Sequence, residues 1–314
     1  MLCLLLVGGL SIWWGTRSNT VAAVPGVQVI GGTYSCRAFP KFALARGFQT
    51  TALLSTSERT IKGLLLYDPA QRNAEDRSRA FRDESWDDAG YLGPLVLDEA
   101  GNIYVAPVPR VSLVDNPPAQ QNTIFRVDTT TGVMAPFIAL PGAATPSSQN
   151  PFGILGLAYD CDTRTLYATS VAGSGPDAER GRIFQIDVAT KTIKGQLNDV
   201  DAIGIGVFNG AKGKRLYWGT ARVAEIHSVA LQPDGSFTGN PRTEFTIAPQ
   251  PIGQNDKARR LNFIANSVLQ INGVQFDFNL RATSEQINNH YQYRYDASKD
   301  RWQVVTDATS SPVP

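Results

Sequence analysis

A basic segment, KARRLN at Lys257–Asn262, has the residue types that bind small anions or sugars. An arginine side chain donates several hydrogen bonds from a planar fork that matches a carboxylate or a phosphate, and an amide side chain both donates and accepts. We expect Arg260 and Asn262 to reach a shared polar pocket together with Asp201 and Asn150. The alternative is that the segment is a solvent-facing loop.

A second segment, DESWDDAG at Asp83–Gly90, gathers four carboxylates around Trp86. Carboxylate oxygens are ligands for Ca²⁺ and also bond sugar hydroxyls, so Asp87 is a further candidate contact at the same pocket. The D-x-D-x-D-G spacing of calcium-binding loops is missing, and a solvated loop is the alternative. Calcium is therefore the one cofactor left open, and otherwise we expect none.

The sequence offers no recognisable catalytic set. The chain has 2 histidines, His227 and His290, and they fall in separate segments, so spacing assembles neither a zinc site nor a Ser-His-Asp triad. Phosphate-binding loops and CxxC pairs are also missing. The formal net charge of +1 gives no basic field for nucleic acid, and the aromatic residues are dispersed along strands. We assign no catalytic residue and no metal ligand, and we expect no nucleic-acid partner.

A repeated phrase supplies the framework that must position these residues. GPLVLDEAGNIYVAP at Gly93–Pro107, GILGLAYDCDTRTLYATS at Gly153–Ser170 and GIGVFNGAKGKRLYWGT at Gly204–Thr220 each indicate a strand, a polar turn and a second strand. Self-similarity at about 40–60 residues is typical of β-propeller blades. We predict an all-β fold with one β-propeller domain over residues 24–306, built from four-stranded antiparallel blades, and a disordered tail over residues 307–314.

Five repeat units are clear, and six blades are favoured because a further unit could lie between Arg72 and Ala89 or be assembled from both chain ends. Five blades is the alternative. Val27–Ile30 is the candidate strand that would close the ring. Aspartates near the ends of the third strands, such as Asp128 and Asp187, are expected to bond the amides of the following turn. The clear units are Phe42–Phe81, Gly90–Pro141, Asn150–Leu197, Asp201–Ile247 and Arg260–Val305.

The N-terminal segment predicts export. Residues 1–23 contain an apolar run, Leu2–Trp14, which is short for a ~30 Å membrane core, and end in small residues at Val21–Ala23. We expect a signal peptide or, if uncleaved, an N-terminal anchor that would be the only membrane contact. Cys36 and Cys161 could form a disulfide in an oxidising compartment, with two separate thiols as the alternative. The expected location is secreted, periplasmic or cell-surface.

The phrases GPLVLDEAGNIYVA, NPFGILGLAYD and DAIGIGV resemble the inner-strand motifs of the senescence-marker-protein/gluconolactonase family, and more broadly those of NHL and strictosidine-synthase-like six-bladed propellers. The resemblance implies a propeller, and the lactonase group binds a metal. Its Glu-Gly-Pro ligand is replaced here by Leu92-Gly93-Pro94, and its Pro-Asn-Gly ligand by Pro151-Phe152-Gly153, while only Asp201 matches the later Asp-Gly ligand. Most of the metal ligands are therefore missing, which argues against lactonase chemistry of this type.

Together these features predict an exported, non-catalytic β-propeller that binds a surface or extracellular partner, a glycan, peptide or protein, through its loop face. The alternative is a hydrolase or lactonase-like enzyme with a polar site at the mouth of the central tunnel, using Asp201 and Arg260. The two differ in whether charged side chains from several blades converge at the axis.

Overall fold

The computed structural model describes residues 29–56, 62–72, 78–109, 114–248, 255–264, 267–280 and 288–305. The expected signal or anchor segment, residues 1–23, and the expected tail, residues 307–314, lie outside these described residues. Within the described part of the chain, no helix has both the length and the apolar character needed to cross a membrane.

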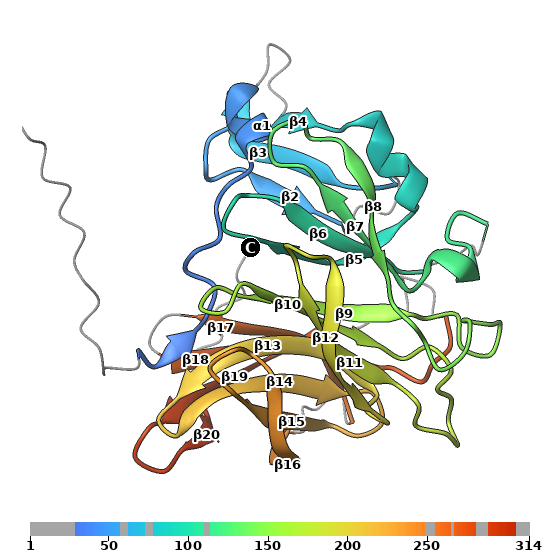
Figure 1. The fold of residues 1–314 in the computed structure, drawn as a ribbon. Coiled ribbons are helices and arrows are strands. Elements are labelled where there is room, and N and C mark those ends of the chain that lie inside the picture. The colour runs from blue at the N-terminus through green and yellow to red at the C-terminus, as the bar shows by residue number, and fades with distance from the viewer. Residues whose placement is uncertain are drawn as a thin grey trace, which may run out of the picture.

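The described residues form five antiparallel sheets (Figure 1), and we number them as blades one to five in chain order. The helices are short: α1 (Lys41–Ala45) and the 3₁₀ helices η1 (Glu84–Ala89) and η2 (Pro118–Gln120). In chain order the strands are β2 (Leu53–Ser55), β3 (Leu65–Arg72) and β4 (Ser78–Phe81) in blade one; β5 (Leu92–Leu97), β6 (Ile103–Pro107), β7 (Thr123–Val127) and β8 (Met134–Ala139) in blade two; β9 (Ile154–Asp160), β10 (Thr165–Ser170), β11 (Arg182–Asp187) and β12 (Thr192–Asn198) in blade three; β13 (Ala202–Gly210), β14 (Gly213–Thr220), β15 (Glu225–Leu231) and β16 (Phe237–Thr246) in blade four; and β17 (Lys257–Ile264), β18 (Val268–Val274), β19 (Asn288–Asp296) and β20 (Arg301–Val304) in blade five.

The prediction of an all-β propeller with four-stranded antiparallel blades is confirmed. The described residues form five blades, the smaller of the two numbers that the sequence left open, and blade one contributes three described strands. The five expected units coincide with the blades except at two ends, since β12 runs to Asn198 and β17 begins at Lys257 rather than at Arg260.

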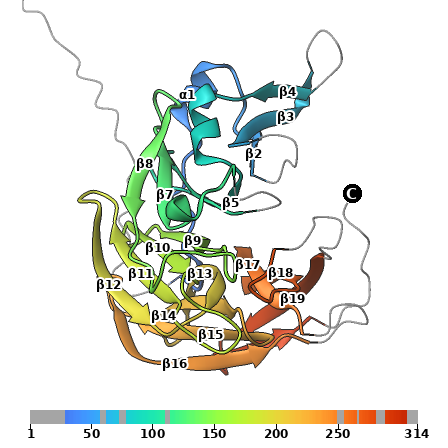
Figure 2. The same cartoon turned by 90° about the vertical axis from the view of Figure 1, so that its right-hand side faces the viewer.

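The first strand of each blade lies nearest the axis of the propeller. Figure 2 shows the blades as an incomplete ring, with blade one and blade five at its two ends. Neighbouring inner strands β5, β9, β13 and β17 contact one another. The strands approach closely at Gly204 of β13, where an added Cβ atom would lie 2.5 Å from the carbonyl oxygen of Ala258. Only glycine tolerates that contact, so blades four and five can meet closely at the axis.

Hydrophobic layers between neighbouring blades hold the ring together. Phe42, Leu64 and Trp86 belong to the layer between blades one and two, and Phe208 and Trp302 belong to the layer between blades four and five. The layers between blades two and three and between blades three and four are of the same kind. Burying each large apolar side chain stabilises the fold by about 1.5–3 kcal/mol. Among the described residues, no such layer joins blade five to blade one.

The aspartates that recur between strands bond the turns that follow them. The Asp128 carboxylate accepts from the Thr130 and Thr131 amides at 2.9 and 3.0 Å, and the pKa of Asp128 is held below its ordinary value mainly by these bonds. Asp187 accepts from the amides of residues 189 and 190 in the same way, at 2.9 and 3.0 Å. The prediction of a turn-bonding role for these aspartates is confirmed.

Residues 29–40, which we call the N-terminal strap, cross the axis instead of closing the ring. The short strand β1 (Gly31–Gly32) pairs antiparallel with β13, the inner strand of blade four. Of the expected closing strand Val27–Ile30, residues 27 and 28 lie outside the described residues, and Val29 and Ile30 form no strand. A disulfide joins Cys36 to Cys161, which follows β9, with the two Cα atoms 5.5 Å apart. The strap is therefore fastened to blades three and four.

Candidate functional site

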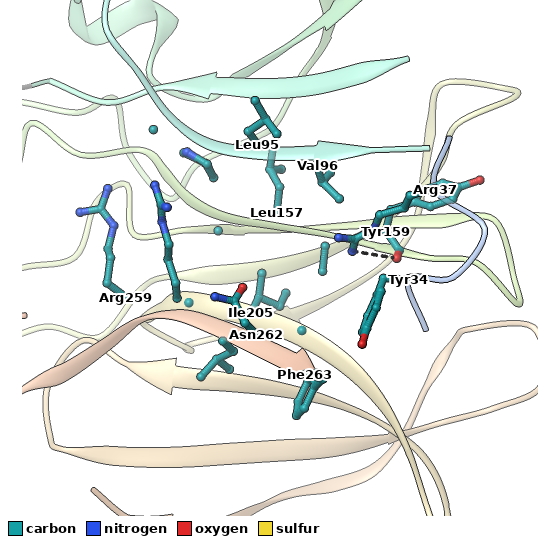
Figure 3. Close-up of a pocket in the computed structure, with 18 of the residues that line it drawn as sticks. Tyr34, Arg37, Leu95, Val96, Leu157, Tyr159, Ile205, Arg259, Asn262 and Phe263 are labelled. Carbon is teal, nitrogen blue, oxygen red and sulfur yellow. Dashed lines mark hydrogen bonds between the residues drawn. The ribbon is translucent and has the colours of Figure 1, made fainter. Parts of the chain in front are cut away.

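A cavity of 640 Å³ lies on the axis, lined by the inner strands of all five blades and by the strap. Figure 3 shows its lining, with Arg259 towards one end, Tyr34, Arg37 and Tyr159 at the other, and apolar side chains between them. Because every blade contributes its first strand, residues distant in the sequence meet here. A concave cavity on which polar side chains converge is the default candidate for a ligand site.

Blade five supplies the densest group of polar side chains. Along β17 the buried Leu261 and Phe263 face blade four, so the alternating Arg260 and Asn262 face the other way and are exposed to the cavity. Asn262 stands opposite Gln270 of β18, and both line the cavity. No hydrogen bond joins the side chains of Arg260, Asn262 and Gln270 to any residue that the structure describes. Their donors and acceptors are available to a ligand.

A β-bulge adds Arg259 to this group. The pairing of β17 with β18 passes from Ala258 to Arg260, which leaves Arg259 as the extra residue. Such a bulge re-aims a side chain, and it lets two consecutive arginines line one cavity. The Arg259 guanidinium reaches across the axis to blade two, where a Cβ atom added to Gly93 would lie 3.6 Å from its Nη2.

The strap brings a third arginine to the opposite end. Arg37 donates from Nη2 to the Tyr159 carbonyl at 3.4 Å, and its guanidinium lies 5.8 Å from the centre of the Tyr34 ring. Burial among protein atoms lowers the pKa of Arg37 to about 10, against an opposing influence from Tyr34. The guanidinium remains charged at neutral pH.

The charged side chains among the described lining residues of the cavity are all cationic. Arg37, Arg259 and Arg260 line it, and none of the described lining residues is an aspartate or a glutamate. The surrounding protein lowers the pKa of Arg260 although solvent reaches its side chain. Such a lowering means that the protein environment makes the positive charge less favourable than water does. An anion entering the cavity would reverse that cost.

Apolar side chains separate the two ends. Leu95 of β5, Leu157 of β9 and Ile205 of β13 line the middle (Figure 3). Beyond the arginines, a separate apolar cluster that includes Phe152, Ile203 and Phe278 closes the axis where the inner strands begin. This end of the axis is therefore a packed core rather than a polar mouth.

Asn150 and Asp201, expected in the same pocket as Arg260, do not line the cavity. Asn150 is buried before β9, where its Nδ2 donates to the carbonyls of Val171 and Ser174 at 2.8 and 3.0 Å and its Oδ1 accepts from the Phe152 amide at 3.0 Å. The amide is fully bonded within its own blade. Its role is to hold the loops above blade three.

The Asp201 carboxylate is bonded on every side. It accepts from the Ser174 hydroxyl, from the Gly181 amide at 2.9 Å and from Arg222 Nε at 2.9 Å. Burial raises the pKa of Asp201 above its ordinary value, and the bonds to Ser174 and Arg222 oppose that rise. Ser174 therefore links Asp201 to Asn150. The two residues support the loops around them, and neither lines the cavity with Arg260.

Asp87 also lies away from the cavity. The segment Asp83–Gly90 folds as the 3₁₀ helix η1, capped by the Asp83 side chain, with Trp86 fully buried and its Nε1 donating to the Gly132 carbonyl at 2.8 Å. Asp87 is exposed and pairs with Arg82. Among the residues that the structure describes, no group of three or more His, Cys, Asp or Glu side chains is placed to hold a metal ion.

Of the residues that the sequence predicts for the pocket, Arg260 and Asn262 line the cavity, and Arg37 and Gln270 line it without having been predicted. Gln270 could have been inferred from strand alternation, since it faces Asn262 across one hairpin. No pattern in the sequence indicates Arg37, because the strap belongs to no repeat and reaches the axis through its pairing and its disulfide.

No protein-family model matches the chain, and no curated protein matches it. Solved structures of low similarity do. They include a nidogen/laminin complex chain (12% identity, 77% of this chain and 88% of that chain covered, TM-score 0.40), the Neurospora crassa Pan2 WD40 domain (11%, 87% and 65%, 0.46) and an exo-β-1,3-galactanase from Phanerochaete chrysosporium (11%, 78% and 57%, 0.47). Similarity at this level says nothing of what the present chain binds.

Proposed function

We propose that this protein is an exported binding propeller whose axial cavity takes a small acidic ligand, a sugar bearing a carboxylate. The observation that carries the proposal is the group formed by Arg260, Asn262 and Gln270, whose side chains line the cavity without a bond to any described residue. Arginine binds carboxylates through two parallel hydrogen bonds, and amides pair with hydroxyls. The apolar wall at Leu157 and Ile205 suits the carbon faces of a sugar ring.

Two features support export. A disulfide such as Cys36–Cys161 persists in oxidising compartments, and the apolar run at Leu2–Trp14 has the length of a signal segment. The enzyme alternative depended on Asp201 meeting Arg260, and Asp201 instead supports loops. Binding is therefore the function that this geometry favours.

Calorimetric titration of the full chain with galacturonate tests the proposal, with galactose as the uncharged comparison. We expect binding of galacturonate and at least tenfold weaker binding of galactose. Arg260→Gln should weaken galacturonate about tenfold or more, because a hydrogen bond to a charged group contributes about 1.5–3 kcal/mol. Arg164→Gln is the matched control, since the Arg164 side chain is 73% exposed on blade three and its one ion pair with a described residue is to Glu99.

Equal affinity for both sugars, or an Arg260→Gln variant that binds as the parent does, would contradict an acidic ligand at this place. A urea denaturation curve for each variant checks that the loss is not caused by unfolding.

A further inference from the structure

The face of blade five turned away from blade four carries polar side chains far beyond the cavity. Directly opposed residues share a face, so the pairing Asn262–Gln270–Gln292 forms one row across three strands. The next rows on either side are Arg260–Asn272–His290 and Ile264–Val268–Arg294–Gln303. We call this the open face; its polar members are Arg260, Asn262, Gln270, Asn272, His290, Gln292, Arg294, Asp296, Arg301 and Gln303.

The open face is exposed and positively charged. Along β19 buried and exposed residues alternate. The tyrosines at 291, 293 and 295 are buried, and His290, Gln292 and Arg294, each directly before one of them, are exposed. No hydrogen bond joins the side chains of Gln292 and Arg294 to any residue that the structure describes. The carboxylate of Asp296 lies at the outer edge of the face and is already bonded by Ser298, Lys299 and Gln303.

The open face and the cavity share three residues. Arg260, Asn262 and Gln270 line the cavity and also begin the rows that run out over β19. Figure 2 shows this face at the end of the incomplete ring, on the side away from blade four. A ligand held in the cavity could therefore extend over the sheet without a break in the polar surface.

We infer that the ligand is a chain of acidic sugars, whose terminal residue occupies the cavity and whose following residues lie on the open face. The inference rests on the proposed function, because it assigns the cavity to one end of the same ligand. Two strand spacings across and four residues along an ideal sheet place the Arg260 and Arg294 Cα atoms roughly 16 Å apart. A single sugar cannot reach both arginines, whereas an oligosaccharide with a carboxylate on each residue can.

The chemistry of the open face favours a sugar chain over a nucleic acid. Both are anionic, but single-stranded nucleic acid is held by bases stacked on aromatic rings. The described side chains of the open face include no aromatic ring beyond the imidazole of His290. Amides at Asn262, Gln270 and Gln292 instead offer the paired donors and acceptors that bind sugar hydroxyls.

The test compares oligogalacturonates of one, three and six residues on the full chain by calorimetry. We expect the hexamer to bind at least tenfold more tightly than the monomer. Arg294→Gln combined with Gln292→Ala should weaken the hexamer about tenfold and leave the monomer unchanged, while Arg260→Gln weakens both. Arg164→Gln again serves as the control.

The outcomes separate the two proposals. If no galacturonate of any length binds, the proposed function fails. If the monomer binds but affinity does not grow with length, or the Arg294 and Gln292 variant binds the hexamer as the parent does, the cavity stands and the extended site is wrong. If a six-nucleotide single strand binds as tightly as the hexamer, through Arg294, the face takes nucleic acid and the inference is overturned.

Discussion

On blade five, the face packed against blade four carries Leu261, Tyr293 and Trp302, while the opposite face carries Arg260, Asn262 and Arg294. Both sets come from the same strands by simple alternation. The packed face is also bonded: the buried Asp256 carboxylate accepts from Tyr291, Asn289 and Gln275. The two faces therefore differ in two ways. The packed face is apolar and its polar groups are hydrogen-bonded, whereas polar side chains of the opposite face such as Arg260, Asn262 and Arg294 have no described hydrogen-bond partner.

In a repeat protein each unit normally buries its face against the next, and a terminal unit presents a polar outer face. Blades one to four each pack a face on the following blade, through four hydrophobic layers. Among the described residues, blade five has a packed face on one side only. Its other face costs the fold little because water solvates it, and it is the part of the molecule most able to bind something else.

The largest expected effect comes from Trp302 on the packed face. The residue is 6% exposed, and its ring lies 4.9 Å from the Phe208 ring and 5.2 Å from the Tyr295 ring, centre to centre. Trp302→Ala should lower the free energy of unfolding by about 3–5 kcal/mol, because it leaves a large cavity. The next residue, Gln303, is on the open face, and Gln303→Ala should cost less than about 0.5 kcal/mol.

Urea denaturation of both variants makes the measurement. If Trp302→Ala and Gln303→Ala lowered the free energy of unfolding equally, the two faces would not differ as described, because the open face would then be packed in solution.

A smaller effect is expected at Asp256, which tests whether bonding matters on the packed face as much as apolar burial. Asp256→Ala removes the acceptor for the Tyr291 hydroxyl at 2.9 Å and the Asn289 amide at 2.6 Å. We expect a loss of about 2–3 kcal/mol, because buried donors are left without partners. Tyr291→Phe, which removes one donor together with its bond, should cost about 1 kcal/mol. If Tyr291→Phe costs more than Asp256→Ala, the carboxylate is not the centre of this network.

Substitutions on the open face should, in contrast, leave the stability of the fold almost unchanged. The double change Arg260→Gln and Asn262→Ala should alter the free energy of unfolding by no more than about 0.5 kcal/mol, because neither side chain has a described partner to lose. The same samples used for ligand titration serve for urea denaturation. A loss of unfolding free energy above about 1 kcal/mol would show that these residues stabilise the fold, and it would argue against a ligand-binding role for them.

The sequence repeat makes the propeller architecture predictable, and the alternation of side chains along a strand predicts part of the candidate site. Arg260 and Asn262 could be assigned to the axis because KARRLN begins the inner strand of a blade. The number of blades could not be fixed, since a sixth unit built from the chain ends needs partners that sequence spacing does not reveal. The same limit applies to the strap, which pairs with the inner strand of blade four although 170 residues or more separate them.

The expected pocket partners show where spacing fails. Asp201 directly precedes the inner strand β13, and the basic segment begins the inner strand β17, so spacing alone predicts a shared pocket. In the structure Asp201 is neutralised by Arg222, from the loop after β14, and bonded by Ser174 from the preceding blade. A buried carboxylate needs such partners, and which residue supplies them depends on loop conformation rather than on the repeat. Charged residues in loops are therefore harder to assign than alternating ones in strands.

The smallest expected effect concerns Asp296, at the outer edge of the open face. Hydrogen bonds from Ser298 and Lys299 lower the pKa of Asp296 to about 2, below its ordinary value near 3.8. The unfolded chain therefore takes up the proton first as the pH falls, so the stability from this group is complete above pH 4 and is lost towards pH 2. Asp296→Asn should melt slightly below the parent at pH 6, and the gap should close as the pH approaches 2. Thermal unfolding across that range measures the gap. A difference in melting temperature that stays constant with pH would mean that Asp296 stabilises the fold through its shape and not through its charge.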